Sequence, residues 1–257
     1  MLVSEVMLQQ TPVSRVVPVY QAWMRRWAEP AALAADPVAE AIRAWGRLGY
    51  PRRAVRLHAA ATTIALERDG VVPADVHALR DLPGVGEYTA AAVAAFAFGQ
   101  RVAVLDTNVR RVLSRAARGE ALPAAHLTRA ERALADALLP PDDETAARWS
   151  VAVMELGALV CTASNPGCTR CPLAQECRWL AAGRPDSTAP RRAQPFAGTD
   201  RQVRGLLMQV LRDADGPVPR DNLDVVWQEP DQRDRALASL VDDGLVVEVV
   251  GGFALPR

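Results

Sequence analysis

Apolar and polar residues recur at helical spacing along most of residues 1–160. Apolar side chains three or four positions apart fall on one face of a helix, so this pattern predicts a series of short helices. Proline and glycine residues separate these segments and mark their ends. The clearest predicted helices cover residues 18–27, 37–48, 52–70 and 149–160.

Residues 87–99 ("EYTAAAVAAFAFG") differ from these segments because they are apolar on nearly every side of a helix. A helix without a polar face is typical of a protein interior. Gly99 is suited to ending it, because glycine readily adopts the left-handed conformation that closes many helices. We therefore expect a buried helix that ends at Gly99.

The last quarter of the chain has a different pattern. Residues 183–200 are rich in Pro, Ser, Gly and Arg, and we expect a linker there. Residues 203–214 and 233–244 have helical spacing, and residues 245–256 form two short apolar runs around a Gly-Gly pair, which is typical of a β-hairpin. Two helices, a short helix between them and a hairpin are the elements of a winged-helix-like module.

Composition narrows the class of protein. Half of the residues are apolar and only 5% are aromatic, a mixture that favours helices over sheets. No apolar run reaches membrane-spanning length, and the first residues lack the pattern of a signal peptide. We expect a soluble, cytoplasmic, monomeric protein with no membrane partner.

The charged residues carry a chemical restriction. Net charge is zero, but residues 1–200 carry 23 arginines against 20 acidic residues, and this excess of +3 permits nucleic-acid binding without indicating it. All 30 basic residues are arginine, so the chain has no lysine. A Schiff base formed through a side-chain amine is therefore excluded.

All four cysteines lie within seventeen residues, as Cys161-x6-Cys168-x2-Cys171-x5-Cys177. A cytoplasmic location disfavours disulfides, which leaves a metal site. Zinc sites usually pair two C-x2-C units across a longer gap, whereas a single C-x2-C flanked by wider gaps suits an iron–sulfur cluster. We expect a [4Fe–4S] cluster, with a zinc-bound loop as the alternative.

The segment "LPGVGEY" contains a turn followed by a helix. Gly84 and Gly86 allow the backbone to approach a ligand closely, and a helix beginning at Glu87 would present backbone N–H groups at its positive end. Such an end binds phosphate without any lysine. A plain glycine-rich connection between two helices is the alternative interpretation.

Two carboxylates are candidates for catalysis. Asp106 follows the apolar run 102–105 and precedes a helical stretch, so it is either a helix N-cap or a catalytic carboxylate. Glu5 lies among Val3, Val6 and Met7; partial burial there would raise its pKa and suit a general acid, whereas a solvated Glu on a helix surface is the alternative.

Five segments together resemble the helix-hairpin-helix DNA glycosylases, and specifically the adenine DNA glycosylases (MutY type). The match covers about residues 1–180 in family order. The segments that carry it are 4–11 ("SEVMLQQT"), 45–58 ("WGRLGYPRRAVRLH"), 82–93 ("LPGVGEYTAAAV"), 104–115 ("VLDTNVRRVLSR") and 154–177 ("MELGALVC" and the cysteine loop).

The resemblance implies a mainly α fold. Its parts would be a six-helix barrel with the helix-hairpin-helix (1–118), a [4Fe–4S] cluster module (119–182) held by the four cysteines, the linker (183–200) and the small winged-helix-like α+β module (201–257). The implied activity is that of a monofunctional DNA glycosylase of base excision repair. It would hydrolyse the N-glycosidic bond of adenine opposite 8-oxoguanine or guanine in double-stranded DNA, after the adenine is flipped out.

The resemblance also implies roles for single residues. Glu5 would protonate the adenine N7, and Asp106 would stabilise the oxocarbenium cation, a division of labour like that of glycosidases. The other implied site residues fall into three groups. Gly84 and Gly86 belong to the helix-hairpin-helix, and Tyr88, Asn108 and Glu155 would surround the flipped adenine. Gln10, Thr11 and Leu48 would contact the DNA double helix near the lesion.

Two alternative functions remain. An endonuclease III-like enzyme for oxidised pyrimidines shares the hairpin, the aspartate and the cluster, but it uses a lysine where this chain has Tyr88. A non-catalytic iron–sulfur DNA-binding regulator would have no need of both Glu5 and Asp106.

The chain departs from the family pattern in three places. Family members have a longer segment before Glu5, so we expect a start upstream of Met1 or a fragment. Many also end in a larger domain that reads 8-oxoguanine, for which residues 201–257 are too short. Any preference for 8-oxoguanine would then rest on the catalytic part alone. Pro51 replaces an aromatic residue that often follows "LGY".

Overall fold

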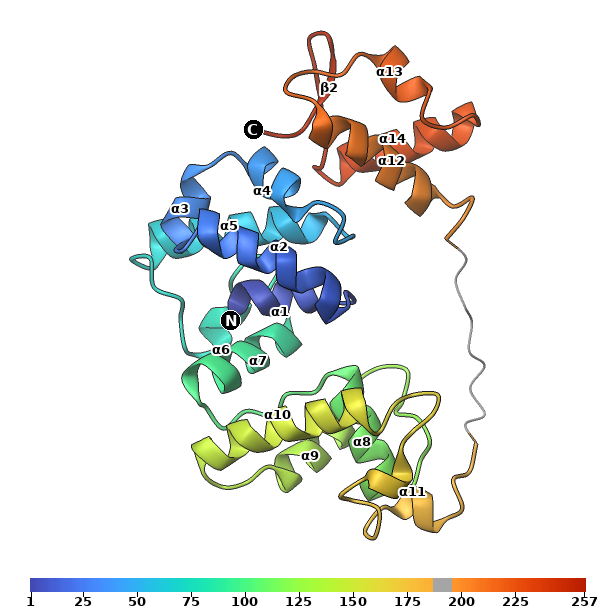
Figure 1. Cartoon of the computed structure of the whole chain (residues 1–257). Coiled ribbons are helices and arrows are strands. Elements are labelled where there is room, and N and C mark those ends of the chain that lie inside the picture. Colours follow the sequence, from blue (N-terminus) through green and yellow to red (C-terminus); the bar gives the residue numbers. More distant parts are fainter. Residues whose placement is uncertain (187–195) are drawn as a thin grey trace. The chain divides into compact units, whose positions relative to one another are not determined.

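The computed structural model describes residues 1–186 and 196–257, and these are mainly helical (Figure 1). The predicted linker falls largely on 187–195, outside the described residues. None of the helices that the structure describes is long and apolar enough to cross a membrane. The elements before the linker are α1 (Leu2–Leu8), α2 (Val13–Arg26), α3 (Pro30–Ala35), α4 (Val38–Trp45), α5 (Arg52–Glu67), α6 (Val76–Arg80), α7 (Glu87–Phe98), α8 (Thr107–Leu113), the π-helical segment η1 (Ser114–Arg118), α9 (Arg129–Leu138), α10 (Asp143–Leu159), the 3-10 turn η2 (Cys168–Arg170) and α11 (Arg178–Ala181).

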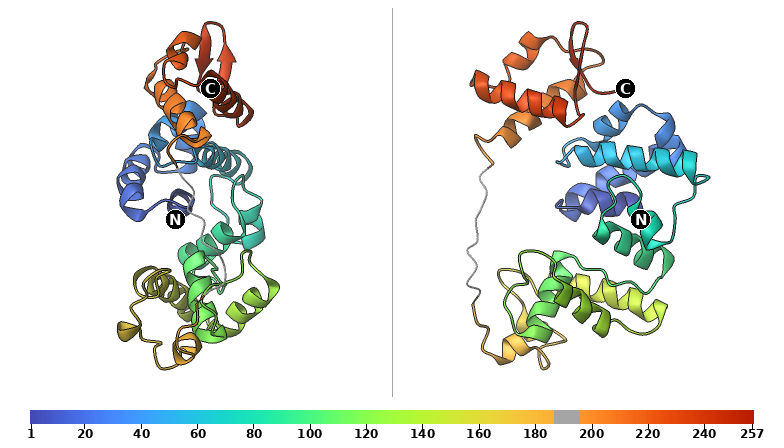
Figure 2. Two further views of the ribbon diagram at one scale, coloured as in Figure 1. Left: turned by 90° about the vertical axis from the view of Figure 1, so that its right-hand side faces the viewer. Right: turned by 180° about the vertical axis from the view of Figure 1, so that it is seen from behind.

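The chain forms two compact units, whose helices Figure 2 shows from two further directions. The cysteine-loop unit comprises Met1, Ala74–Arg80 and Val85–Arg191, and the terminal unit comprises Leu2–Pro73, Asp81–Gly84 and Arg192–Arg257. The domain boundaries inferred from sequence stay predictions.

The cysteine-loop unit is built around α7, α8 and α10. Seven consecutive residues of α7, Thr89 to Ala95, are buried, which confirms the predicted interior helix. Gly99 ends it with φ 65°, and its N–H bonds to the carbonyls of Ala94 and Ala95. Val109 and Val112 of α8 pack with Val153 of α10.

In the terminal unit, three tryptophans form the centre of the N-terminal helices. Trp23 of α2 meets Trp27 and Trp45 edge-to-face, at ring distances of 4.6 and 5.8 Å. Edge-to-face pairs add to the gain from burial, because a positive ring edge meets a negative ring face. Trp23 and Trp45 are 1% and 0% exposed, so they fix how α2 and α4 pack.

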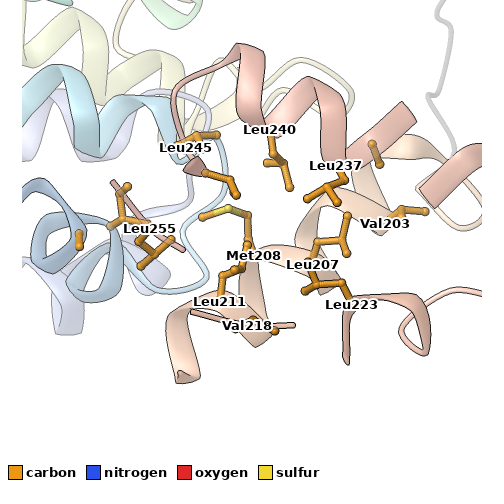
Figure 3. Packing of buried hydrophobic residues seen from close by; sticks show 14 residues of the cluster. Val203, Leu207, Met208, Leu211, Val218, Leu223, Leu237, Leu240, Leu245 and Leu255 are labelled. Atoms are coloured by element: carbon orange, nitrogen blue, oxygen red, sulfur yellow. The ribbon is translucent and has the colours of Figure 1, made fainter. Parts of the chain in front are cut away.

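The same unit contains the C-terminal module (residues 200–257), with helices α12 (Asp200–Asp213), α13 (Arg220–Asp224) and α14 (Pro230–Asp242) and strands β1 (Val247–Val249) and β2 (Gly252–Ala254). The strands pair antiparallel, and Val218 bridges to Phe253. Figure 3 shows the buried core of this module, in which Leu207, Met208 and Leu211 of α12 pack with Leu237 and Leu240 of α14.

Glu131 links two helices of the cysteine-loop unit. It forms a capping box with Thr128 at the start of α9 and an ion pair of 2.9 Å with Arg110 of α8, both side chains being 11% exposed. Burial raises the pKa of Glu131, but hydrogen bonds from Thr128 and Arg110 outweigh that effect, and the net pKa lies below its ordinary value.

We expect Glu131→Gln to lower the free energy of unfolding at pH 7 by about 1–3 kcal/mol, because Arg110 loses its carboxylate. The folded-state pKa is depressed, so the stabilisation by ionised Glu131 is fully present above the unfolded pKa and is lost as pH falls through the folded pKa. Urea denaturation at pH 7 and at pH 3 should therefore show a gap between the two proteins that shrinks in acid. A gap of equal size at both pH values would contradict this role.

Candidate functional site

Asp106 caps the helix that follows it, and both of its carboxylate oxygens are engaged. Its Oδ1 accepts a 2.6 Å hydrogen bond from the Val109 N–H, and its Oδ2 accepts one of 2.8 Å from Asn108 Nδ2. The predicted N-cap geometry is therefore present. This N-cap geometry is compatible with a catalytic role, because the two hydrogen bonds fix the direction in which the half-buried carboxylate of Asp106 points.

Asn108 is in turn held by Arg111, which is 8% exposed. Arg111 Nη2 donates to Asn108 Oδ1 at 2.8 Å and to the Gly157 carbonyl at 2.6 Å, and its Nε donates to the Cys161 carbonyl at 2.7 Å. A continuous series of hydrogen bonds thus runs from Asp106 to the first cysteine of the loop. Burial lowers the pKa of Arg111.

Gly157 makes this arrangement possible. A Cβ at position 157 would lie 2.7 Å from the Cβ of Asn108 and 2.8 Å from its carbonyl oxygen, closer than atoms of this kind approach. The glycine therefore lets α10 approach the start of α8. Neither Arg111 nor Gly157 stands out in the sequence. Helical spacing places Arg111 on the side of α8 away from Val109 and Leu113, so the apolar pattern gives no signal for its burial.

The four cysteines line one small cavity, together with Arg115 and Trp179. Among the residues that the structure describes, no group of three or more His, Cys, Asp or Glu side chains is arranged to hold a metal ion. The fold nevertheless brings all four thiols of the loop to one place. Burial raises the pKa of the Cys171 thiol, an effect that ligation to iron would reverse.

Arg115 lies beside this cavity on η1 and is 3% exposed. Its Nη1 is 3.5 Å from Cys161 Sγ and donates to the Thr162 carbonyl at 2.8 Å. Its guanidinium also stacks 4.4 Å from the ring centre of Trp179. A π-helical turn often occurs at a functional site, and here it carries a cation next to the thiols.

The remaining predicted residues of this unit lie on α7 and α10. Tyr88, at the start of α7, is partly buried against the cluster of Ala91, Ala92, Ala95 and Val104. Gly86 is the N-cap of α7, with no side chain to cover the helix end. Glu155 is exposed on α10.

Glu5 belongs to the terminal unit, on α1, and is 8% exposed. The predicted burial is confirmed. Gly84 of the hairpin turn belongs to this unit too, with φ 78°, and a Cβ there would lie 2.6 Å from the Cβ of Arg56. The turn therefore requires glycine both for its conformation and for space.

Arg53 gathers the segment after Glu5 and the "GRLGY" turn around one guanidinium. Its Nη1 donates to the carbonyls of Val6, Met7 and Gln9, and its Nη2 to Thr11 Oγ1 and the Gly49 carbonyl, over distances of 2.6–3.0 Å. The side chain is 7% exposed. Thr11 Oγ1 also donates to the Leu48 carbonyl at 3.3 Å. Three predicted contact residues, Gln10, Thr11 and Leu48, are thereby brought together.

These three residues differ in exposure. Leu48 and Thr11 are 4% and 6% exposed, whereas Gln10 is exposed and has a left-handed backbone conformation with φ 55°. A second exposed side chain comes from Tyr50, which sequence analysis did not single out; its φ is 48° and it is 46% exposed. Left-handed conformations cost energy for residues other than glycine and persist only where the surroundings fix them.

Comparison with known proteins identifies the family. A model of the HhH-GPD superfamily of base excision DNA repair proteins matches residues 3–138. Adenine DNA glycosylases of Mycolicibacterium smegmatis and Mycobacterium tuberculosis are 59% and 56% identical over 99% of this chain, covering 86% and 84% of their own lengths. The chain belongs to the adenine DNA glycosylase family. The human adenine DNA glycosylase is 42% identical over 68% of the chain, which corresponds to 32% of the human protein.

Comparison with solved structures shows that this member of the adenine DNA glycosylase family has a fold similar to those of a thymine-DNA glycosylase and of endonuclease III. A thermostable thymine-DNA glycosylase superposes with a TM-score of 0.61 and 28% identity, over 70% of this chain and 83% of that one. Endonuclease III in a non-covalent DNA complex superposes with a TM-score of 0.62 and 25% identity, over 71% and 83%.

We expect Arg111→Met to lower the free energy of unfolding by about 2–4 kcal/mol, since Asn108, Gly157 and Cys161 lose their common donor while the side chain keeps its length. The control is Arg148→Met on α10, whose side chain is 78% exposed and whose change should stay within about 0.5 kcal/mol. Urea denaturation of the three proteins measures both effects. Similar losses for the two variants would contradict a special role for Arg111.

Proposed function

We propose that the chain is a monofunctional DNA glycosylase that removes adenine mispaired with 8-oxoguanine or guanine from double-stranded DNA. As a member of the adenine DNA glycosylase family it is a hydrolase of the N-glycosidic bond. The observation that carries the proposal is the pair of carboxylates within this family sequence. Glu5 is buried, and Asp106 is held by a backbone N–H and by Asn108.

Each carboxylate has a separate task in this reaction. Protonated Glu5 donates to N7 of the flipped adenine, so that the base leaves neutral as the bond between the sugar C1′ and N9 breaks. The anion of Asp106 stabilises the positive charge that develops on the sugar ring. Water then adds to C1′, which leaves free adenine and an abasic site. Burial of Glu5 supports its role, because a buried carboxyl group is fixed in place and shielded from bulk water.

Other residues are proposed to bind the DNA and the base. The N-terminus of α7, behind Gly84 and Gly86, suits a DNA phosphate because the positive end of the helix dipole and the backbone N–H groups point there. Tyr88, Asn108 and Glu155 are proposed to line the adenine site. Gln10 and Thr11 are proposed to contact the duplex at the lesion. Leu48 is buried in this conformation of the turn, whereas Tyr50 is exposed and is proposed to meet the mispair.

The cysteine loop is proposed to hold a [4Fe–4S] cluster through Cys161, Cys168, Cys171 and Cys177. Thiolates are the usual ligands of this group, and all four line one cavity. When bound, the cluster would cross-link the loop and thereby fix the Cys161 carbonyl to which Arg111 is bonded. Arg115 would offset part of the negative charge of the thiolates. We also propose that residues 201–257 form a winged-helix-like module.

The two alternatives fit the chain less well. Strand cleavage of the endonuclease III type requires an amine that attacks the sugar, and this chain has no lysine and carries Tyr88 in the corresponding place. A regulator that only binds DNA has no need of a buried acid together with an oriented carboxylate.

We expect Glu5→Gln and Asp106→Asn each to slow adenine release by at least about 100-fold, because each removes an acid or a charge needed in the transition state. Single-turnover assays on A·8-oxoguanine and A·G duplexes measure the rate, and Glu67→Gln at the exposed end of α5 is the matched control. Strands should break only after treatment with hot alkali. Undiminished release by Glu5→Gln, or strand breakage without alkali, would overturn the assigned chemistry.

We expect the purified protein to contain about four iron atoms per chain and to absorb broadly in the visible range, as a [4Fe–4S] cluster requires. Cys171→Ser should reduce both signals and lower the melting temperature, because the loop loses a covalent tie. Elemental analysis separates the alternatives directly: one zinc per chain with no visible band would replace the cluster with a zinc site.

A further inference from the structure

The C-terminal module contacts the N-terminal helices of its own unit within residues 39–55. Arg43 donates to the carbonyls of Arg212 and Ala214, and Arg47 Nε donates to Gln209 Oε1 at 3.2 Å. Tyr50 lies under the guanidinium of Arg201, at 5.1 Å from its ring centre, and Arg52 pairs with Asp243 at 3.1 Å. These contacts occur before, within and after the turn Gly46–Tyr50.

Apolar packing joins the same two parts. Ala39 and Ile42 of α4 belong to the buried cluster formed by Leu207, Met208 and Leu211 of α12, and Ile42 is 0% exposed. The module and the helix that leads into the turn therefore share one core, part of which Figure 3 shows.

The backbone of the turn is costly to order, although Arg53 and Trp45 already donate to the Gly49 carbonyl. Gly46, Gly49 and Tyr50 all have positive φ, at 55°, 85° and 48°. Glycines lose more conformational freedom than other residues when they are ordered, so such a turn is costly to fix. If contacts from outside the turn order it before DNA binds, the binding free energy no longer has to offset this loss of conformational entropy.

The charged residues of the module argue against DNA binding by the module itself. Acidic residues outnumber arginines in residues 201–257. Most of its arginines already pair with nearby aspartates, a use that leaves few for phosphate. These pairs are Arg204 with Asp243, Arg220 with Asp224 and Asp234, Arg233 with Asp224, and Arg235 with Asp200.

We propose that the C-terminal module is an intramolecular brace that holds the turn Gly46–Tyr50 in the conformation that engages the mispair, with Arg201 and Gln209 as positioning residues. The inference rests on the proposed function, because the turn matters only if it meets DNA. The brace acts on binding and not on the breaking of the glycosidic bond.

The test uses Arg201→Ala, Gln209→Ala and the double variant in the 257-residue chain. Arg235→Ala is the control, since it is an exposed arginine of the same module whose partner is Asp200. Hydrogen exchange of peptides covering residues 46–50 reports on the turn without DNA. Equilibrium binding to an A·8-oxoguanine duplex and single-turnover release at saturating protein report on function.

We expect the double variant to exchange several-fold faster in the turn and to bind about 3- to 10-fold more weakly, with an unchanged rate of release at saturation. The control should match the wild type in all three measurements. Weaker binding with wild-type exchange would mean that Arg201 contacts DNA directly, and wild-type behaviour in both would remove the brace altogether. If the wild type releases no adenine, the proposed function fails, whereas the exchange comparison still tests the brace.

Discussion

The guanidinium of Arg111 is the point on which the geometry of the candidate catalytic carboxylate depends. It joins the side chain that orients Asp106 to the backbone of α10 and of the cysteine loop. Three segments far apart in sequence meet at one cation, and Gly157 provides the room for it. A loosening of the cysteine loop would therefore reach Asp106 through hydrogen bonds alone, without any change in the residues of the reaction.

Arg53 performs a similar task in the terminal unit. Its donors satisfy carbonyls at the C-terminal end of α1 and in the turn before α5, where helix ends leave backbone groups without partners in the helix. In both units the family motif thus contains two kinds of residue. Some, such as Glu5 and Gln10, are suited to meet DNA, and others, such as Arg53, hold them in place.

Periodicity predicted much of the fold, because long apolar helices such as α5, α7 and α10 leave a clear trace in sequence. The short helix α6 leaves a weaker trace. The helix α9 was not predicted, although its residues are amphipathic and begin at the capping box of Thr128 and Glu131. The N-cap at Asp106 and the burial of Glu5 were each one of two alternatives that the neighbouring residues allowed. The arginine centres were not predicted, since an arginine in a helix usually faces water, and the acceptors of Arg111 lie up to 50 positions away in sequence. Likewise, the positive φ of Tyr50 decides that its side chain faces outward while that of Leu48 is buried.

The choice of arginine at both centres has a consequence for how the protein responds to acidity. A guanidinium keeps its proton throughout the range in which carboxylic acids titrate, even where burial weakens its hold. Histidine in either place would switch charge near neutrality and carry the surrounding framework with it. Both arginines therefore keep their charge over that range, so a pH profile of the proposed reaction would not be changed by the titration of these two supports.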